Sequence, residues 1–461
     1  MTIYEKLREL GFNTVGPAFY EKVKEWRSWY AGDVKDFTHY KVRTGKMETL
    51  CKRHSLGMAK KLCEDWANLL MNEKVVITLE GEKEQAFVDE VFRANNFEVK
   101  ANEAQELKSA VGTVAYIPRV VGQREGEAAQ AIHIDFVDVE HIYPLTWRNG
   151  MVEECAFANR FTVDGEDYLY LQVHQRGANG LYEIHNHIFE CDNGNIGDKP
   201  RVAPAGYENI PDVVNTASAE RTFVIDRLNI ANNYEANNPL GIPVFANAID
   251  VLKGVDIAYD SYVNEFMLGK KRIMVKPSAT DFLNGQPAFD HNDVLFYVLP
   301  EDVSDGAVIQ PIDMSLRTAE HNTGIQDQLN LLSSKCGFGE NHYKFNGGSV
   351  ATATQIVSEN STMFRTIKKH EIILESVLVE LCRILLHYGN ASMGAGLDED
   401  VEISIDFDDS IIEDEETNFN RDARLVQMGV MNLWEFRAKW MNEDEETAKA
   451  SLPQMEALIA E

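Results

Sequence analysis

Residues 245–266, FANAIDVLKGVDIAYDSYVNEF, place apolar side chains at the spacing of one helix face. The apolar positions are Phe245, Ile249, Leu252, Tyr259, Val263 and Phe266. Intervals of three, four and seven residues predict an amphipathic helix, roughly 30 Å long at about 1.5 Å of rise per residue. Asp250, Asp260 and Glu265 lie on the other side, so we expect an acidic outer face.

A second helix is predicted after a short insert. Residues 270–314 contain three strand patterns, with turns at Asn284-Gly285 and Asp305-Gly306. The strand patterns are Arg272–Val275, Val294–Val298 and Ala307–Gln310. The second helix is expected from about Leu316 to Lys335, where Gly337 and Gly339 end it. Two amphipathic rods therefore bracket a small module.

A glycine-rich loop and a long helix follow the second rod. The loop, residues 337–350, reads GFGENHYKFNGGSV. The apolar stripe that comes next predicts a helix from about Thr352 to Tyr388, with Gly389 and Asn390 as its C-terminal cap. A strand at Val401–Phe407 and a helical tail complete the chain.

The first half of the chain combines helices with a β-rich stretch. Residues 1–72 read as mostly helical, and the clearest helix runs from Ser55, its expected N-cap, to Met71. Residues 111–230 carry five short strand patterns in near succession, with a hairpin signal at Asn149-Gly150. This order predicts an antiparallel meander and a mixed α+β, multidomain fold.

The composition restricts the function classes. The 461 residues include 74 acidic and 44 basic side chains, a formal net charge of −30. Such a chain repels phosphates over most of its surface. The six cysteines form no CxxC motif, which favours reduced thiols in a cytosolic compartment. The N-terminus lacks a signal-peptide core, and no apolar run reaches the ~20 residues of a membrane span.

The common enzyme motifs are absent or incomplete. There is no P-loop and no GxSxG elbow, and Gly337-Phe338-Gly339 lacks the third glycine of a dinucleotide fingerprint. His370-Glu371 begins like HExxH, but Leu374 replaces the second histidine.

Two metal sites are weighed against simpler interpretations. His185, His187 and Cys191 could share a strand face, although a polar hairpin end is favoured because no fourth ligand follows. Residues 398–416 hold eleven Asp or Glu and no Lys or Arg. A metal-dependent nuclease or hydrolase could use these carboxylates. A solvated acidic face is favoured, and a divalent cation near Asp406 and Asp408 stays open.

The order of elements resembles that of the portal proteins of siphoviruses. Ser55–Val76 (SLGMAKKLCEDWANLLMNEKVV) is similar to that family's N-terminal helix and strand. Ala351–Thr366 (ATATQIVSENSTMFRT) is similar to the start of its long helix, and Ile405–Glu416 (IDFDDSIIEDEE) to the strand and acidic stretch beyond. The similarity covers most of the chain.

The resemblance implies a division of the chain into named parts. We expect a β-rich and helical wing, a two-helix stem, a small α/β clip, a tunnel loop, a long wing helix and a helical crown. The ranges are 1–240 for the wing, 241–269 for stem helix 1, 270–314 for the clip, 315–336 for stem helix 2, 337–351 for the tunnel loop, 352–388 for the long wing helix, and 389–461 for the wing strand and crown.

The resemblance also implies function and partners. The expected assembly is a ring, usually of twelve subunits, at the capsid portal vertex of a virion assembled in the host cytoplasm. Double-stranded DNA would pass through it without sequence readout. A terminase large subunit, a head-completion or adaptor protein, and scaffold and major capsid proteins are the expected partners. No membrane, cofactor or catalytic residue is implied. Another virion structural protein, a capsid or adaptor subunit, is the remaining alternative.

Few cations suit a channel, because phosphate affinity grows with each Lys or Arg contact. The tunnel loop is the place where direct DNA contact is expected, through His342, Tyr343, Lys344 and Asn346. A basic cluster near the stem and clip could make weak phosphate contacts, intersubunit ion pairs or a solvated face. It consists of Lys253, Lys270, Lys271, Arg272 and Lys276.

Overall fold

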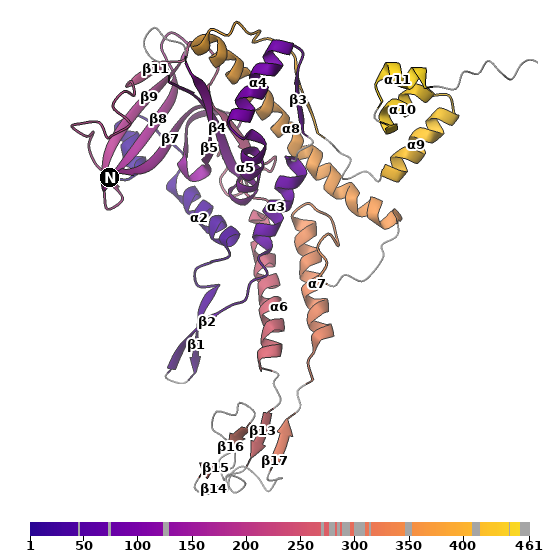
Figure 1. Cartoon of the computed structure of the whole chain (residues 1–461). Coiled ribbons are helices and arrows are strands. Elements are labelled where there is room, and N and C mark those ends of the chain that lie inside the picture. Colours follow the sequence, from indigo (N-terminus) through magenta and orange to yellow (C-terminus); the bar gives the residue numbers. More distant parts are fainter. Residues whose placement is uncertain are drawn as a thin grey trace, which may run out of the picture.

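The structure is a computed structural model of the whole chain. It describes residues 1–44, 47–71, 75–122, 129–268, 272–275, 282–283, 286–287, 296–298, 309–312, 315–345, 353–407, 415–441 and 443–451. Helices and mostly antiparallel sheets are mixed throughout this part of the chain (Figure 1). The predicted mixed α and β class is confirmed.

A meander forms one side of the body. Its strands follow the order β10-β9-β8-β7-β6, and β11 pairs with β9. The bounds are β6 Ile142–Arg148, β7 Met151–Val163, β8 Glu166–Arg176, β9 Tyr182–Asp192, β10 Asn195–Ile196 and β11 Val213–Asn215. Asn149 and Gly150 both have positive φ, at 51° and 78°, as a type I′ turn between β6 and β7 requires. The meander and this hairpin are confirmed.

A second sheet packs beside a layer of helices. Its order is β12-β4-β5. The sheet and its neighbouring helices are β4 Thr113–Val121, β5 Ala131–Asp138, β12 Val224–Arg227, α3 Met58–Leu70, α4 Glu82–Ala94 and α5 Phe97–Val111. Buried between them, Lys108 Nζ lies 2.9 Å from Asp226 Oδ1, and Gln105 Nε2 donates to Asp226 Oδ2 at 2.7 Å. Burial is the main cause that lowers the pKa of Lys108.

The N-terminal region is less helical than predicted. Helices α1 Ile3–Glu9 and α2 Pro17–Ala31 are followed by a β hairpin, β1 His39–Thr44 and β2 Met47–Lys52. Helix α3 begins at Met58 and not at Ser55, because the Ser55 hydroxyl donates to Asp256 and accepts from the backbone N–H of Gly57. The expected N-cap therefore fastens the approach to α3 onto another helix.

Helix α8, Ala353–Met393, is longer than predicted. At about 1.5 Å per residue it spans roughly 60 Å. Gly389, expected to end it, lies inside it. The absence of a side chain at this position leaves room for close packing, because a Cβ there would sit 2.7 Å from the Phe87 ring and 2.9 Å from Leu397. After α8 the chain returns as β18 Ile403–Asp406, which pairs with β3 Val76–Leu79.

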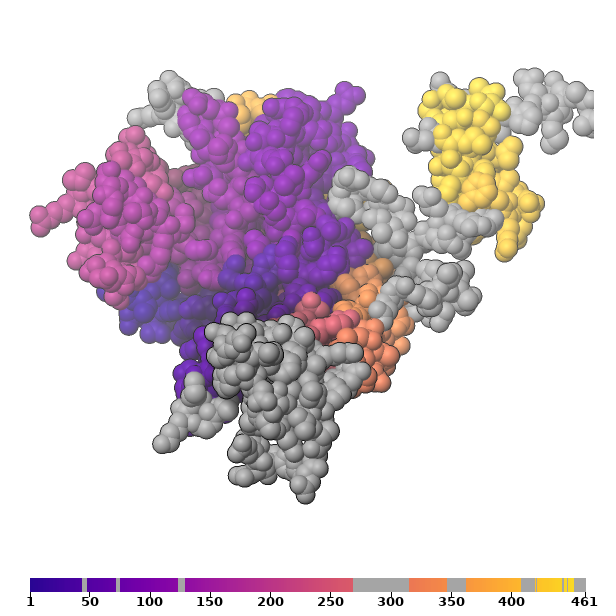
Figure 2. All heavy atoms as spheres, turned by 60° about the horizontal axis from the view of Figure 1, so that its bottom comes forward, coloured from indigo at the N-terminus to yellow at the C-terminus, as the bar shows by residue number. Residues whose placement is uncertain are grey.

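Two further parts lie outside the body. Beyond the rods a sheet of order β16-β13-β17 forms from β13 Arg272–Val275, β16 Phe296–Val298 and β17 Ile309–Ile312, with β14 Phe282–Leu283 and β15 Gln286–Pro287 as a separate pair. The C-terminal helices stand to one side of the other described atoms (Figure 2). They are α9 Glu415–Gln427, α10 Leu433–Met441 and α11 Glu445–Ala450. Phe419, Phe436 and Trp440 hold α9 against α10.

Candidate nucleic-acid interface at the α6–α7 hairpin

Two helices leave the body side by side (Figure 1). They are α6, Ile249–Leu268, preceded by a short 3₁₀ turn at Ala246–Ala248, and α7, Thr318–Lys335. The apolar residues at their body end are buried. These are Val251, Leu252 and Val255 on α6, and Ile325, Leu329 and Leu332 on α7. The predicted rods are confirmed as helices, and we call the pair the α6–α7 hairpin.

An ion pair closes the end of the α6–α7 hairpin that lies away from the body. Arg317 donates to Glu265 through its backbone N–H at 3.2 Å, Nε at 3.1 Å and Nη2 at 2.8 Å. The hydrogen bonds from Arg317, and a smaller one from His321, lower the pKa of Glu265 to about 2. Glu265, expected on an acidic outer face, is therefore used to join the two helices.

Two aspartates of α6 also turn inward. Asp256 accepts from the backbone N–H of Leu56 at 2.9 Å and from Ser55 Oγ at 3.0 Å. Asp260 accepts from the backbone N–H of His54 at 3.0 Å. Burial raises the pKa of Asp256. The prediction of an outward-facing Asp260 is wrong because the strand-to-helix segment 54–56 covers it, whereas Asp250 stays exposed.

The chain turns sharply at the body end of α7. Gly337 and Gly339 have φ of 88° and 87°, a conformation that favours glycine. The turn buries Phe338 against Trp66, whose Nε1 donates to the carbonyl of Cys336 at 3.2 Å. The described part of the expected tunnel loop therefore begins as a packed joint with α3.

Residues 341–345 are held by side chains from α7 and α3. Gln326 donates to the carbonyl of Tyr343 and accepts from the N–H of Phe345, each at 2.8 Å. The Tyr343 hydroxyl donates to Asp65 at 2.8 Å. Burial and the Asp65 carboxylate raise the pKa of Tyr343 far above its usual range. This hydroxyl, expected as a free polar tip, is already engaged.

Two of the four expected DNA contacts are exposed in the described residues, namely His342 and Lys344. Asn346 lies outside the described residues. The close stacking of His342 on Phe338, with ring centroids 4.5 Å apart, fixes where that imidazole lies. Contact with DNA stays a prediction for all four.

The expected basic cluster is only partly described. Lys253 pairs with Asp250 one helical turn away, at 3.0 Å. Arg272 lies on β13, and Lys270, Lys271 and Lys276 lie outside the described residues. Lys253 therefore has an anionic partner on its own helix, in an exposed pair that a phosphate could replace at little cost.

The other sequence candidates do not assemble into a metal centre. His185 contacts Gln175 and Glu183, and His187 stacks on Phe189. His370 is buried, which lowers its pKa to about 3, and it accepts from the N–H of Asn229. Across the described residues, no group of three or more His, Cys, Asp or Glu is placed to hold a metal ion.

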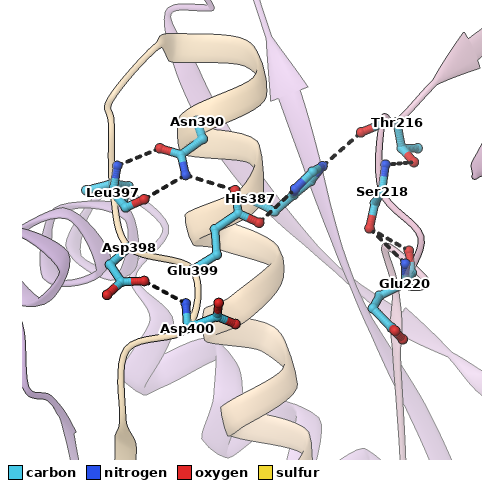
Figure 3. A network of polar contacts seen from close by, with 9 residues as sticks. All are labelled: Thr216, Ser218, Glu220, His387, Asn390, Leu397, Asp398, Glu399 and Asp400. Atoms are coloured by element: carbon cyan, nitrogen blue, oxygen red, sulfur yellow. Dashed lines mark hydrogen bonds and ion pairs between the residues drawn. The ribbon is translucent and has the colours of Figure 1, made fainter.

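Glu399, in the described part of the acidic stretch, is bound to the body. His387 bridges Glu399, at 3.0 Å, and the carbonyl of Thr216, at 2.9 Å (Figure 3). Asn390 donates to the carbonyl of Leu397 and to Glu399. These contacts border a groove of about 610 Å³ along α8. Asp408 lies outside the described residues, so a cation near Asp406 and Asp408 stays a prediction.

No described helix has the length and apolarity of a membrane span.

Sequence comparison identifies the family of the chain. A family model described as "Phage portal protein, SPP1 Gp6-like" matches residues 14–457. No curated protein matches the chain.

Solved structures that resemble the chain at low identity include the following three. One, the neck of an empty GTA particle computed with C6 symmetry, is 11% identical with a TM-score of 0.43, covering 86% of this chain and 90% of that one. A virion of a native gene transfer agent particle gives 11% and 0.41, over 86% and 89%. The neck of a native GTA particle computed with C12 symmetry gives 10% and 0.41, over 83% and 89%.

Proposed function

The chain belongs to the SPP1 Gp6-like family of phage portal proteins, and from this membership we propose that it forms a ring-shaped channel at the capsid vertex. The capsid portal role follows from the family. The proposal adds that copies close into a ring, that double-stranded DNA passes through its centre during packaging and ejection, and that a terminase and head-completion proteins dock on it. In the ring each subunit uses two different surfaces, since head-to-tail contacts close by rotation.

The α6–α7 hairpin is the observation that supports a channel best. The pair of helices stands out from the folded body, and the end away from the body closes in a defined ion pair, Glu265–Arg317. Repetition around an axis would bury the remaining sides of each pair. From the same family membership we assign the wing, stem, clip, tunnel loop and crown to this chain, with the ranges expected from the sequence.

Electrostatics supports loose handling of DNA. The net charge of −30 disfavours a tight phosphate grip over most of the surface. The cations that remain exposed near the 336–345 turn, Lys344 foremost, would touch the DNA backbone without reading bases. A channel needs contacts that are weak enough to release a moving polyanion.

Electron microscopy of the purified protein tests the ring. We expect closed rings with an axial hole, most with twelve subunits in assembled particles. A protein that stays monomeric under all assembly conditions would contradict the proposal.

DNA passage is tested in a packaging assay with Lys344→Glu. Reversing this charge should alter the packaged DNA per particle while ring images remain unchanged. Lys199→Glu, on a loop of the β-rich side, is the matched control. Normal packaging by Lys344→Glu would remove this residue from the channel while leaving the ring untouched.

A further inference from the structure

The β1–β2 hairpin is a basic arm on an acidic chain. Residues 39–52 contain four Lys or Arg and one Glu. The register pairs Lys41 with Leu50 and Arg43 with Glu48. Directly paired residues share a face, so Lys41, Arg43 and Leu50 point the same way. Both cations lie 3.5 Å from Glu48, and one carboxylate cannot neutralise two cations. This face keeps an excess of positive charge.

Most side chains of the arm whose burial is described are exposed. Strands β1 and β2 pair only with each other in this part of the chain. Leu50 is 67% exposed and Val42 on the opposite face is 41% exposed. A lone two-stranded hairpin is marginally stable in water. A surface that covers the arm would therefore stabilise it.

The end of the arm nearest the body, which we call its root, is fixed to α6. Arg53 donates to the carbonyl of Phe37 at 2.7 Å, and its guanidinium lies over the Phe37 and Tyr40 rings. The next residues, 54–56, are bound by Asp256 and Asp260 of α6. The arm thus extends beside α6, on the side away from α7 in Figure 1. A fixed root lowers the entropy lost when the arm binds.

The α6–α7 hairpin offers a complementary surface. On α7, Glu320, Asp327 and Leu331 are seven and four residues apart and exposed, away from the buried stripe. Within the described residues neither carboxylate makes a hydrogen bond or a salt bridge. On α6, Ile257, Phe266 and Met267 are exposed as well. Glu320, Asp327 and Leu331 thus form an acidic and apolar face on α7 that matches the basic and apolar groups of the arm.

We propose that the β1–β2 hairpin of one subunit docks on the α6–α7 hairpin of a neighbouring copy of this chain. The inference rests on the ring proposed above. Rotation about a ring axis along the α6–α7 hairpin keeps every element at its own height, so an arm beside α6 meets the neighbour's α6–α7 hairpin. Lys41 and Arg43 face Glu320 and Asp327, and Leu50 covers exposed apolar side chains.

Channel DNA is the other polyanion that a basic arm could meet. The arm lies on the opposite side of α6 from α7 in Figure 1. Tyr343 and Phe345 of the 336–345 turn are bound to α7 through Gln326. In this view the arm and α7, which holds the turn, lie on different sides of α6. The geometry favours an acidic protein surface as the partner.

A charge swap tests the contact. Sedimentation velocity and electron microscopy would follow ring formation by full-length protein over a range of salt concentrations. We expect Lys41→Glu with Arg43→Glu to weaken assembly by about tenfold or more, because like charges then oppose each other. Adding Glu320→Lys and Asp327→Lys should restore rings. The matched control is Lys199→Glu with Arg201→Glu, which changes the net charge equally in an exposed loop.

The possible outcomes distinguish failure of the arm proposal from failure of the ring proposal. Wild-type protein that never forms rings overturns both proposals. Wild-type rings with unchanged assembly of the arm variant at every salt concentration overturn the arm alone. Loss of rings without rescue by the α7 substitutions removes α7 as the docking surface. Unchanged rings that bind a 30-base-pair duplex more weakly would assign the arm to DNA. Circular dichroism and thermal melting confirm that each variant is folded.

Discussion

The body and the α6–α7 hairpin differ in where they place charged groups: the body buries an ion pair, and the hairpin leaves one exposed to solvent. In the body, Lys108 and Asp226 are almost completely buried and are satisfied by each other, Gln105 and Tyr116. In the α6–α7 hairpin, Arg317 stays two-thirds exposed while it holds Glu265. A buried pair must be complete within the chain because water cannot replace a lost partner, whereas an exposed pair tolerates substitution.

Apolar side chains show the same contrast. Trp66, Phe338 and Leu329 are buried where α7 meets the body, whereas Ile257 and Phe266 are exposed further along α6. Exposed apolar side chains on a helix that projects from the body are available for contacts with another chain. The body is folded by its own contacts, whereas the parts that project from it would be covered by other subunits in the proposed ring.

The largest effect should come from Lys108→Met. This change leaves the Asp226 carboxylate buried without its cation, which costs roughly 3–5 kcal/mol of unfolding free energy. Urea denaturation measures it. Adding Asp226→Leu should recover part of the loss, because no buried charge then remains. The control Lys199→Met, at an exposed pair, should change stability by under about 0.5 kcal/mol. Equal effects at the two sites would break the comparison.

A matched pair of glycine substitutions compares the joint with the rod. Gly337→Ala should cost about 1–3 kcal/mol, since φ is 88° and the new Cβ would lie 2.8 Å from Thr366 Cγ2. Gly324→Ala, in the middle of α7 with no atom within 4 Å of the added Cβ, should gain up to about 1 kcal/mol. Thermal melting of both variants shows whether each substitution raises or lowers the stability. A loss of stability at Gly324 would show that α7 is more closely packed than described.

The pH dependence of the α6–α7 hairpin follows from Glu265. Its folded-state pKa, about 2, is below the ordinary 4.5. The contribution to stability is therefore present above about pH 4.5 and is lost as the pH falls toward 2. Glu265→Gln should remove this share of the acid dependence, as measured by urea denaturation between pH 3 and 7. Asp250→Asn, at an exposed carboxylate, is the control. Identical acid slopes for wild type and Glu265→Gln would refute the assignment.

The smallest effect on the isolated chain should come from Ile257→Ser. This side chain is half exposed, so the unfolding free energy of monomeric protein should change by about 0.5 kcal/mol or less. Ring assembly should weaken measurably, because the same side chain is expected to be covered by a neighbouring subunit. Urea denaturation of the monomer measures the stability, and native mass spectrometry across a dilution series measures ring assembly. A stability loss without an assembly defect would place Ile257 in the body's own core.

Much of the element order could be predicted, because local patterns set it. The 3.6-residue stripe located α6 and α7, and the alternation in residues 151–189 located β7 to β9 with the turn at Asn149-Gly150. The β1–β2 hairpin was missed because its alternation of polar and apolar side chains, His39 to Arg43, is short and lies within a stretch that was predicted to be mostly helical. The pairing of β18 with β3 was missed because more than 300 residues separate the two strands.

The candidate interface was predictable to a smaller extent. The glycines at 337 and 339 indicated a turn, and that turn is present. The sequence could not show that Tyr343 donates to Asp65, or that Asp260 accepts from His54. Both contacts join residues more than 200 positions apart, and no local periodicity records such a distance.

The sequence by itself determined the helices, the meander, the turn glycines and the acidic balance, because these depend on near neighbours along the chain and on composition. The tertiary structure alone decided which charges remain free. Asp256, Asp260, Glu265 and Tyr343 look like surface groups in the sequence, and folding places partners beside each of them. Whether a charge is solvated depends on what packs against it, which only the folded chain specifies.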